Sequence, residues 1–367
     1  MNCEKDKRVV VTLDAGGTNF VFSAIQGNQE IIAPIVKPSF ANDQERCLNS
    51  IVNGFEEVFA LVSQQVSAIS FAFPGPADYD KGIIGDLPNF KAFNGDVILG
   101  PLLENHFNVP VFINNDGNLF ALGEALTGFL PEVNDMLKKC GSNKQYKNLI
   151  GLTIGTGFGC GIVIGDTLLK GDNSCGGEIH NTLNKNRPDW NAEESVSSRA
   201  IQRIYAQNAS VEFSAAPMPK DIYEVAKGEK AGDQNAAMQS FAEFGEALGN
   251  SVCNVLTLID GLVVIGGGLS GAWDLFAPHM FKELNKKYIN VTGEYVNRLS
   301  MKVFNLEHPI DLNGFCRGGM KEKLVPNTNR KIIYDAFARA GVGRSKNDAS
   351  KSISLGAYAY ALVRLDS

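Results

Sequence analysis

Near its amino end the chain reads Val9-Val10-Val11-Thr12-Leu13-Asp14-Ala15-Gly16-Gly17-Thr18-Asn19-Phe20-Val21-Phe22-Ser23-Ala24-Ile25. Two apolar, β-branched runs flank an aspartate, two glycines and a threonine, which predicts a strand, a tight turn and an antiparallel strand. Gly16 and Gly17 let backbone N–H groups approach a ligand, Thr18 adds a hydroxyl, and converging N–H groups form an anion site. Asp14 beside the turn can hold a hydrated magnesium ion. A plain hairpin is the alternative, although hairpin turns usually take two residues such as Asn-Gly.

The same order of features returns in the second half of the chain. Residues 149–154 predict a strand, Gly155-Thr156-Gly157-Phe158-Gly159 a glycine turn, and residues 160–164 a returning strand. Two halves that each present a phosphate-type loop imply a nucleotide held in the cleft between them. A dinucleotide-binding G-x-G-x-x-G does not fit, because the sixth position after Gly155 and Gly157 is Cys160.

A third glycine-rich turn follows a long helix. Apolar residues at helical spacing predict a helix over 236–259, and a buried strand follows over 262–265. Gly266-Gly267-Gly268 come next, and three glycines permit close approach by a planar group such as a nucleoside. We expect this turn to contribute to the same nucleotide site.

Two strand ends in the first half carry candidate ligand-binding residues. The strand expected over 66–73 runs into Pro74-Gly75-Pro76, at a place where α/β sheets bind ligands. The strand over 109–113 ends in Asn114-Asn115-Asp116-Gly117-Asn118 and enters a helix. Asp116 at that junction is either a helix cap or a functional carboxylate, and one cap residue would suffice.

Length and composition allow two domains of a soluble globular protein. With 367 residues, we expect an amino-terminal α/β lobe over 8–127, completed by a helix at 353–367, and a second lobe over 128–352. A net charge of −6 argues against a nucleic-acid partner, and no apolar run reaches membrane-spanning length. Seven scattered cysteines without C-x-x-C spacing indicate reduced thiols. No signal-peptide region is recognised at the amino end, so we expect a cytoplasmic protein.

Some segments give weaker indications. Residues 30–36 are expected to continue the first hairpin as a third strand, and the polar stretch 133–147 to lead into the second lobe. Residues 297–350 are the least readable, and we interpret Gly341-Val342-Gly343 as a loop.

Together the motifs resemble the ROK family of sugar kinases and sugar-responsive regulators, within the actin/hexokinase-like ATPase superfamily. The resemblance covers about residues 9–362, and the order and spacing of its motifs are specific. The matching motifs are Asp14-x-Gly16-Gly17-Thr18, Phe73-Pro74-Gly75-Pro76, Pro88-Asn89-x-x-x-Phe93, Asn115-Asp116-Gly117-Asn118, Gly155-Thr156-Gly157-x-Gly159, Gly177-Glu178-Ile179 and Gly266-Gly267-Gly268.

The resemblance implies an α/β, two-lobed, ribonuclease H-like fold with duplicated βββαβ cores and an interlobe cleft. It also implies ATP-dependent phosphorylation of a hexose or N-acetylhexosamine at its primary hydroxyl, with ATP and Mg²⁺ as cofactors. Asp116 would be the base that takes the hydroxyl proton. The sugar would be bound by Gly75, Asn89, Asn115, Asp116, Glu178, Asn181 and Glu193. ATP would be bound by Asp14, Gly16, Gly17, Thr18, Gly155, Thr156, Gly157, Gly266, Gly267 and Gly268, with Asp14 holding Mg²⁺ through water.

One departure concerns zinc. The family usually has a zinc-binding histidine where this chain has Asn181, and His180 lies one residue early. A cysteine cluster normally precedes the sugar-binding glutamate, but residues 186–192 contain no cysteine, so we expect no structural zinc. Glu193 is preferred to Glu194 because Glu193-x-x-x-Ser197 fits the family register.

Several questions stay open at this stage. The alternative function is a catalytically silent sugar-binding regulator of the same family. The identity of the sugar, the role of His180 and the assembly state, for which a homodimer is one option, are not decided by the sequence.

Overall fold

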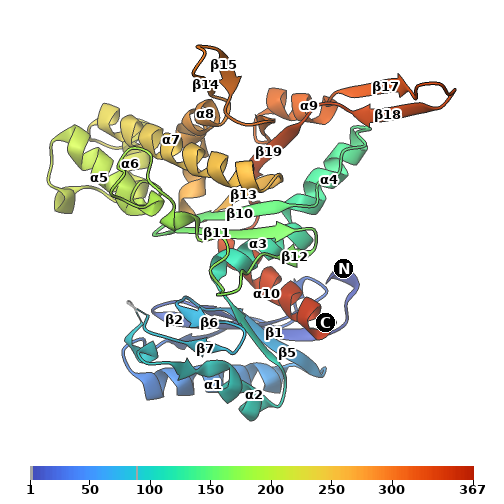
Figure 1. The fold of residues 1–367 in the computed structure, drawn as a ribbon. Helices are drawn as coiled ribbons and strands as arrows, with labels where there is room; N and C mark the ends of the chain where they lie inside the picture. Colours follow the sequence, from blue (N-terminus) through green and yellow to red (C-terminus); the bar gives the residue numbers. More distant parts are fainter. Residues whose placement is uncertain (1–2, 88–89) are drawn as a thin grey trace. The chain divides into compact units, whose positions relative to one another are not determined.

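The computed structural model describes residues 3–87 and 90–367, and they form two compact α/β units (Figure 1). Unit 1 consists of Met1–Pro131, Gly161–Gly177 and Lys346–Ser367, and unit 2 of Glu132–Cys160 and Glu178–Ser345. The sequence-based boundaries differ mainly at residues 161–177, which group with unit 1. The reason is a close approach, because a Cβ atom on Gly161 would lie 2.3 Å from the carbonyl oxygen of Gly117.

Unit 1 is built on a mixed sheet whose strand order is β3-β2-β1-β5-β9, with β4 paired to β2. Its strands are β1 (Val9–Ala15), β2 (Asn19–Gln26), β3 (Gln29–Glu30), β4 (Ile35–Pro38), β5 (Val66–Ala72) and β9 (Val111–Asn114). The predicted first hairpin is confirmed, since β1 and β2 are antiparallel with Ala15 opposite Phe20. β5 lies parallel to both β1 and β9. A small sheet of β6 (Ala77–Asp78), β7 (Ile83–Ile84) and β8 (Val97–Ile98) follows β5.

Helices cover both faces of this sheet. The helices of unit 1 are α1 (Gln44–Leu61), α2 (Leu99–Phe107), α3 (Asp116–Leu126) and α10 (Ala349–Leu365), and α4 (Phe129–Lys139) continues into unit 2. Alternate residues of β1 point to opposite faces: Val9 and Val11 pack in one core cluster with Phe55 of α1, and Val10 packs with Tyr358 of α10. The carboxyl-terminal helix therefore packs within unit 1.

Unit 2 contains a run of four parallel neighbours, β10-β13-β19-β16. The strands of unit 2 include β10 (Leu149–Ile154), β13 (Leu262–Gly266), β16 (Lys302–Asn305) and β19 (Arg339–Arg344). The strand β11 (Phe158–Ile164) begins in unit 2 and ends in unit 1, to which β12 (Thr167–Leu168) also belongs. Its helices are α5 (Ser198–Ala209), α6 (Pro219–Ala226), α7 (Gln234–Leu258), α8 (Trp273–Leu284) and α9 (Pro309–Arg317). The predicted long helix is confirmed as α7, which is capped by Asp233 and packs against α5 and α8.

Two separate hairpins also belong to unit 2. They are β14 (Lys287–Ile289) with β15 (Tyr295–Asn297), and β17 (Met320–Leu324) with β18 (Lys331–Asp335). Every residue of β14, β15 and β17 is exposed, as are four of the five residues of β18. Figure 1 shows both hairpins standing away from the parallel strands.

Two of the weaker predictions are wrong. The third strand expected over 30–36 is split, because β3 ends at Glu30 and β4 begins only at Ile35. The stretch 133–147, expected to lead into the second lobe, begins as helix α4, whose apolar residues Val133 and Leu137 are buried. Gly341 and Gly343 lie inside β19 and not in a loop; a Cβ atom on Gly341 would lie 2.6 Å from the Leu306 side chain, which would have to move to admit it.

No helix among the described residues combines the length and the apolar character needed to cross a membrane.

Candidate active site

The β1–β2 turn is held in place by a serine from the following strand connection. Ser39 donates from its Oγ to the carbonyl oxygen of Gly17 at 2.6 Å, and from its backbone N–H to that of Thr18 at 2.9 Å. Gly17 and Thr18 are exposed, and Asp14 is half-buried at the end of β1. The hydrogen bonds from Ser39 therefore fix the backbone of the turn, while Gly17 and Thr18 remain open to solvent.

Gly16 and Gly17 are glycines for different physical reasons. A Cβ atom on Gly16 would lie 2.7 Å from the carbonyl oxygen of Asn19, so the fold itself requires a glycine there. A Cβ atom on Gly17 would meet nothing within 4 Å, and its φ is not positive. Neither protein packing nor backbone strain explains Gly17, whereas a ligand that approaches the backbone would.

The junction between β9 and α3 settles which residue caps the helix. Asn115 is the N-cap, and its side-chain Oδ1 accepts a hydrogen bond from the N–H of Asn118 at 2.6 Å. Asp116 is the first helical residue, and its Oδ1 accepts only from the adjacent Gly117 N–H, at 2.8 Å, among the bonds described. The interpretation of Asp116 as the cap is wrong, because the neighbouring asparagine performs that role.

The electrostatic surroundings of Asp116 favour its protonated form. Asp116 is accessible to solvent, yet desolvation raises the pKa of its carboxyl, and the negative charge of Asp14 raises it further. Hydrogen bonds from backbone N–H groups, that of Gly117 first, act in the opposite direction. A carboxylate whose pKa is raised is a better proton acceptor than an ordinary aspartate.

The other predicted sugar ligands of unit 1 lie in loops. Gly75 is exposed in the connection after β5, beside Tyr79, whose hydroxyl donates to the carbonyl oxygen of Phe73 at 3.0 Å. Asn89, together with Pro88, lies outside the described residues. Phe90 and Phe93 are buried in the unit 1 core and anchor this part of the chain.

In unit 2 the structure brings two glycine turns together. β10 and β13 are parallel, with Thr153 opposite Gly266, so the turn at 155–157 and Gly266–Gly268 leave the same edge of the sheet. Gly267 has a φ of 90°, and a Cβ atom on it would lie 2.4 Å from the carbonyl oxygen of Ile154. Gly155, like Gly17, has open space where a Cβ atom would be.

Glu193 is attached to the first of these turns. Its Oε2 accepts a hydrogen bond from the N–H of Phe158 at 3.0 Å, and its Oε1 lies 2.8 Å from Arg199. Glu194 instead pairs with Arg199 through both carboxylate oxygens and is more exposed. This difference supports the choice of Glu193 over Glu194 as the ligand.

Glu178 immediately precedes a short 3₁₀ turn (Ile179–Asn181) that contains His180 and Asn181. The Nδ1 atom of His180 lies 2.9 Å from Oε2 of Glu178, and both residues are half-buried. Asn181 is exposed. Of the predicted sugar ligands, Glu178 and Asn181 are thus placed at the same turn.

Some supporting residues were not found from the sequence. Ser39 holds the first turn, and Ser198 holds the second, by donating its N–H and Oγ to the carbonyl oxygen of Gly155 at 2.7 and 2.9 Å. Asn118, which the sequence motif already contained, donates from Nδ2 to Oδ1 of Asn114 at 2.9 Å and fixes the junction next to Asp116. The two serines lie far along the chain from their turns and carry no spacing signal, so only the fold could identify their contacts.

The residues present fit a nucleotide with a magnesium ion. Gly17 and Gly155 each leave a space beside exposed backbone that a Cβ atom would otherwise fill. Asp14 supplies a carboxylate close enough to Asp116 to raise its pKa, and a cation would relieve that repulsion. Among the described residues no cluster of three or more His, Cys, Asp or Glu could hold a metal by itself. Mg²⁺ commonly needs only one or two protein carboxylates, since phosphates and waters complete its coordination.

Comparison with known proteins places this geometry in a family. Residues 10–303 match the ROK family, so the chain belongs to it. A glucokinase from Parabacteroides distasonis, known from its crystal structure, is 51% identical and has a TM-score of 0.90, with 99% of each chain covered.

More distant relatives agree on the class. The glucokinase of Thermotoga maritima is 26% identical over 306 residues, which cover 79% of this chain and 91% of the relative. An N-acetyl-D-glucosamine kinase of Vibrio vulnificus is 27% identical over 299 residues, or 76% and 89% of the two chains. A ROK glucokinase from Streptomyces griseus, solved with glucose and AMPPNP, shares the fold, with a TM-score of 0.61 at 18% identity and 97% and 99% coverage. The chain is an ATP-dependent sugar kinase with the two-lobed, actin/hexokinase-like fold.

Proposed function

We propose that this chain is a glucokinase that transfers the γ-phosphoryl group of ATP to the primary hydroxyl of glucose. The choice of glucose is supported by the 51% identity to the Parabacteroides distasonis glucokinase. The observation that carries the catalytic assignment is Asp116, whose carboxylate stands at the start of α3 while Asn115 performs the capping.

Asp116 acts as the general base in this proposal. The sugar hydroxyl is a weak nucleophile, and a positioned base that accepts its proton typically contributes about 10²–10⁴-fold to the rate. The raised pKa of Asp116 suits that task, because the carboxylate gains affinity for the proton that it must accept. The rest of the rate enhancement comes from positioning and charge neutralisation, as in other phosphoryl transfers.

The proposed sugar-binding groups supply both hydrogen-bond donors and acceptors. Asn115 keeps its side-chain NH₂ available as a donor while its Oδ1 caps α3. Carboxylates accept hydrogen bonds from hydroxyls, so Glu178 and Glu193 suit the acceptor role, and Asn181 offers both a donor and an acceptor. Gly75 and Asn89 complete the proposed set of sugar ligands.

Asp14 and the glycine turns form the nucleotide part of the proposal. The backbone of Gly16, Gly17 and Thr18 and of Gly155, Thr156 and Gly157 would bind the phosphates, and Gly266–Gly268 would lie against the nucleoside. Bound Mg²⁺ supplies charge neutralisation at the phosphates, and Asp14 would hold it through water. Structural zinc is not part of the proposal, since residues 186–192 contain no cysteine; elemental analysis that finds one zinc per chain would contradict this.

A panel assay tests the function. ADP release is measured with glucose, N-acetylglucosamine, N-acetylmannosamine, mannose and fructose, and glucose should give the highest kcat/KM. A higher value for an N-acetylhexosamine would move the substrate to that class. Calorimetric sugar binding without ADP release from any sugar would favour the silent-regulator alternative.

A homodimer is also part of the proposal, and the β17–β18 hairpin supports it. Ile333 is 60% exposed and Leu324 is 58% exposed, although an isolated two-stranded hairpin is at best marginally stable in water. The hairpin carries Lys321, Lys323, Arg330 and Lys331 against Glu322 and Asp335, whereas the whole chain has a net charge of −6. A basic, apolar hairpin therefore complements the acidic body of a second copy.

Light scattering with size separation tests this assembly. The wild-type chain should have the mass of a dimer, and Ile333→Glu should shift it towards the monomer. Leu61→Glu is the control, because Leu61 is equally exposed but lies at the end of α1. A monomeric wild-type chain would overturn the proposal.

The cytoplasmic location stays a proposal that rests on the cysteines. All seven are free, and five of them are buried. Burial raises the pKa of Cys47, for example, to about 12, so its thiol stays protonated and unreactive at neutral pH. A reducing compartment suits a chain with this many free thiols.

A further inference from the structure

The loop over 182–195 carries Glu193 and is closed at its base by backbone contacts. The N–H of Ala192 donates to the carbonyl oxygen of Thr182 at 2.9 Å, and Leu183 forms an isolated β-bridge with Asn191. The loop therefore has a defined shape although it contains only one short 3₁₀ turn, η4 (Ala192–Glu194).

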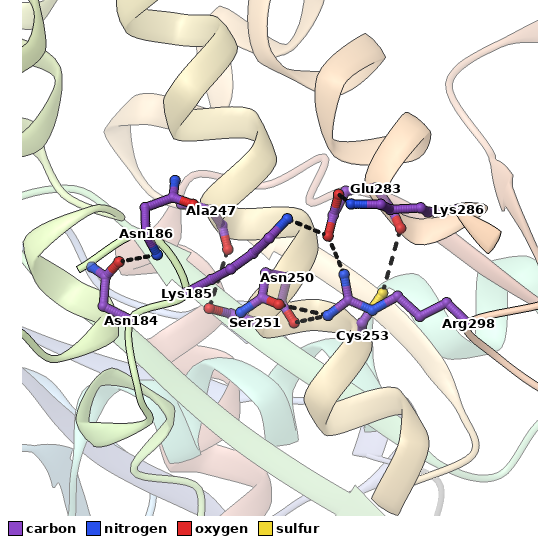
Figure 2. A network of polar contacts seen from close by, with 10 residues as sticks. All are labelled: Asn184, Lys185, Asn186, Ala247, Asn250, Ser251, Cys253, Glu283, Lys286 and Arg298. Atoms are coloured by element: carbon purple, nitrogen blue, oxygen red, sulfur yellow. Dashed lines mark hydrogen bonds and ion pairs between the residues drawn. The ribbon is translucent and has the colours of Figure 1, made fainter. Parts of the chain in front are cut away.

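Asn184 organises the interior of this loop. It is 3% exposed, and its Nδ2 donates to the carbonyl oxygen of Asn191 at 3.0 Å and to Oγ of Ser195 at 2.7 Å. Its Oδ1 accepts from the backbone N–H groups of Asn186 and Arg187. One buried amide thus joins the two arms of the loop; Figure 2 shows its contact with Asn186.

The next residue connects the loop to the helices. Lys185 extends away from Asn184, and its Nζ lies 2.8 Å from Oε1 of Glu283 in α8 (Figure 2). The Glu283 side chain is only 7% exposed, whereas that of Lys185 is 37% exposed.

Glu283 is the centre of a wider network. Arg298, which follows β15 and whose side chain is 5% exposed, pairs with the same oxygen of Glu283 and donates to Oδ1 of Asn250 in α7 at 2.6 Å. Lys286 lies 3.5 Å from the other oxygen. Among the cations described around Glu283, Lys185 is the one that comes from the loop.

The charge on Glu283 persists over the physiological pH range. Burial favours its neutral form, but the hydrogen bond from Lys185 and the charges of Lys185, Arg298 and Lys286 keep the pKa of Glu283 below its ordinary value. The attachment point for Lys185 is therefore a permanent carboxylate, held in place by α7, α8 and the β15 end.

We infer that Lys185 is a positioning residue for Glu193: its ion pair with Glu283 fixes the 182–195 loop on α8 and so keeps the Glu193 carboxylate against the Phe158 N–H. This inference rests on the proposed role of Glu193 in sugar binding. Without the ion pair the loop samples other arrangements, and the apparent sugar affinity falls by the fraction of chains in which Glu193 is misplaced. Once sugar is bound the site is complete, so turnover at saturation is unaffected.

Steady-state kinetics with glucose test the inference. Lys185→Met should raise the KM for glucose by up to about fivefold, the equilibrium change that a partly exposed ion pair can carry, with kcat and the KM for ATP unchanged. Lys185→Arg should restore most of the affinity, because a guanidinium can bind the same carboxylate. Lys286→Met is the matched control, since it removes a cation from Glu283 without touching the loop, and the KM for glucose should stay at the wild-type value.

Hydrogen exchange on the ligand-free chain separates this inference from the proposed function. Lys185→Met should speed exchange at residues 184–195, including the Asn186 and Arg187 amides that donate to Asn184, and Lys286→Met should not. Equal exchange in the two variants, or equal KM values for glucose, would overturn the positioning role. If the wild-type chain phosphorylates no sugar of the panel, the proposed function and the role of Lys185 in sugar binding both fail, and exchange then reports only on the attachment of the loop.

Discussion

The β1–β2 turn in unit 1 and the turn at 155–157 in unit 2 are two versions of one motif, and their differences are more informative than their likeness. In each, a serine from a later segment binds a turn carbonyl oxygen: Ser39 that of Gly17 and Ser198 that of Gly155. The first turn has a carboxylate in its own strand, Asp14. The second obtains one from a distant loop, since Glu193 accepts from Phe158 N–H.

This difference assigns separate roles to the two turns. Asp14 lies close enough to Asp116 for its charge to raise the pKa of that carboxyl, so we propose that the first turn serves the metal and the reacting hydroxyl. The second turn is tied to a loop that we assign to the sugar. A duplicated motif can therefore keep its backbone and diverge through the residues that contact it.

The largest effect is expected where unit 1 departs from unit 2, at Asp116. Asp116→Asn keeps the size of the side chain but removes the proton acceptor, so kcat should fall by about 10²–10⁴-fold while glucose affinity changes little. Coupled assays and calorimetry measure the two quantities. If Asp116→Asn has near-normal turnover, Asp116 is not the general base, and the proposed difference between the two turns is lost.

The pH dependence sharpens the same point. Since the pKa of Asp116 is raised, the acid limb of kcat/KM should lie above the ordinary aspartate pKa of about 4, and activity should fall about tenfold per pH unit below it. The stability of the fold depends on pH in the opposite direction to the activity. A raised folded-state pKa contributes stability below the unfolded value and loses it as the pH rises through the folded value. Asp116→Asn should therefore stabilise the fold at neutral pH and not in acid, as thermal unfolding at both pH values would reveal.

The glycines test whether both turns bind the same ligand. Gly17→Ala and Gly155→Ala meet no protein atom, so each should fold normally and raise the KM for ATP by about tenfold, the loss of about 1.5 kcal/mol in one charge-assisted hydrogen bond. Gly16→Ala should instead lower the melting temperature, because its Cβ would clash with Asn19. Gly271→Ala, which also has open space outside the candidate site, is the control. If Gly17→Ala raises the KM for ATP and Gly155→Ala does not, only the first turn contacts ATP.

The smallest effect separates capping from catalysis within α3. Asn115→Ala removes the side-chain cap and should lower the free energy of unfolding by about 1 kcal/mol. Asp116→Ala should show no such capping loss. Denaturant unfolding measures both, and equal destabilisation would mean that Asp116 shares the capping role.

Local patterns predicted much of the fold because they are short-range. The β1–β2 hairpin, α7 and the closing helix α10 follow from apolar periodicity and turn residues, and the structure has them. The errors arose where a neighbour overrides the local pattern. Gly341 looks like a loop residue, but it lies in β19, paired with Phe304 of β16, and the Leu306 side chain fills the space beside it.

For the candidate site, the sequence by itself determined the chemical groups: Asp14, Asp116, Glu178, Glu193 and the glycine turns stand out by residue type and spacing. Only the tertiary structure decided which of these groups also cap a helix or bind another part of the chain. Asn115 and not Asp116 caps α3, Glu193 is bound to the Phe158 N–H, and the loop that carries Glu193 is attached through Lys185 to Glu283, far along the chain. The physical reason is that hydrogen bonds and ion pairs depend on distances of about 3 Å between side chains, and chain folding sets those distances without leaving a periodic trace in the sequence.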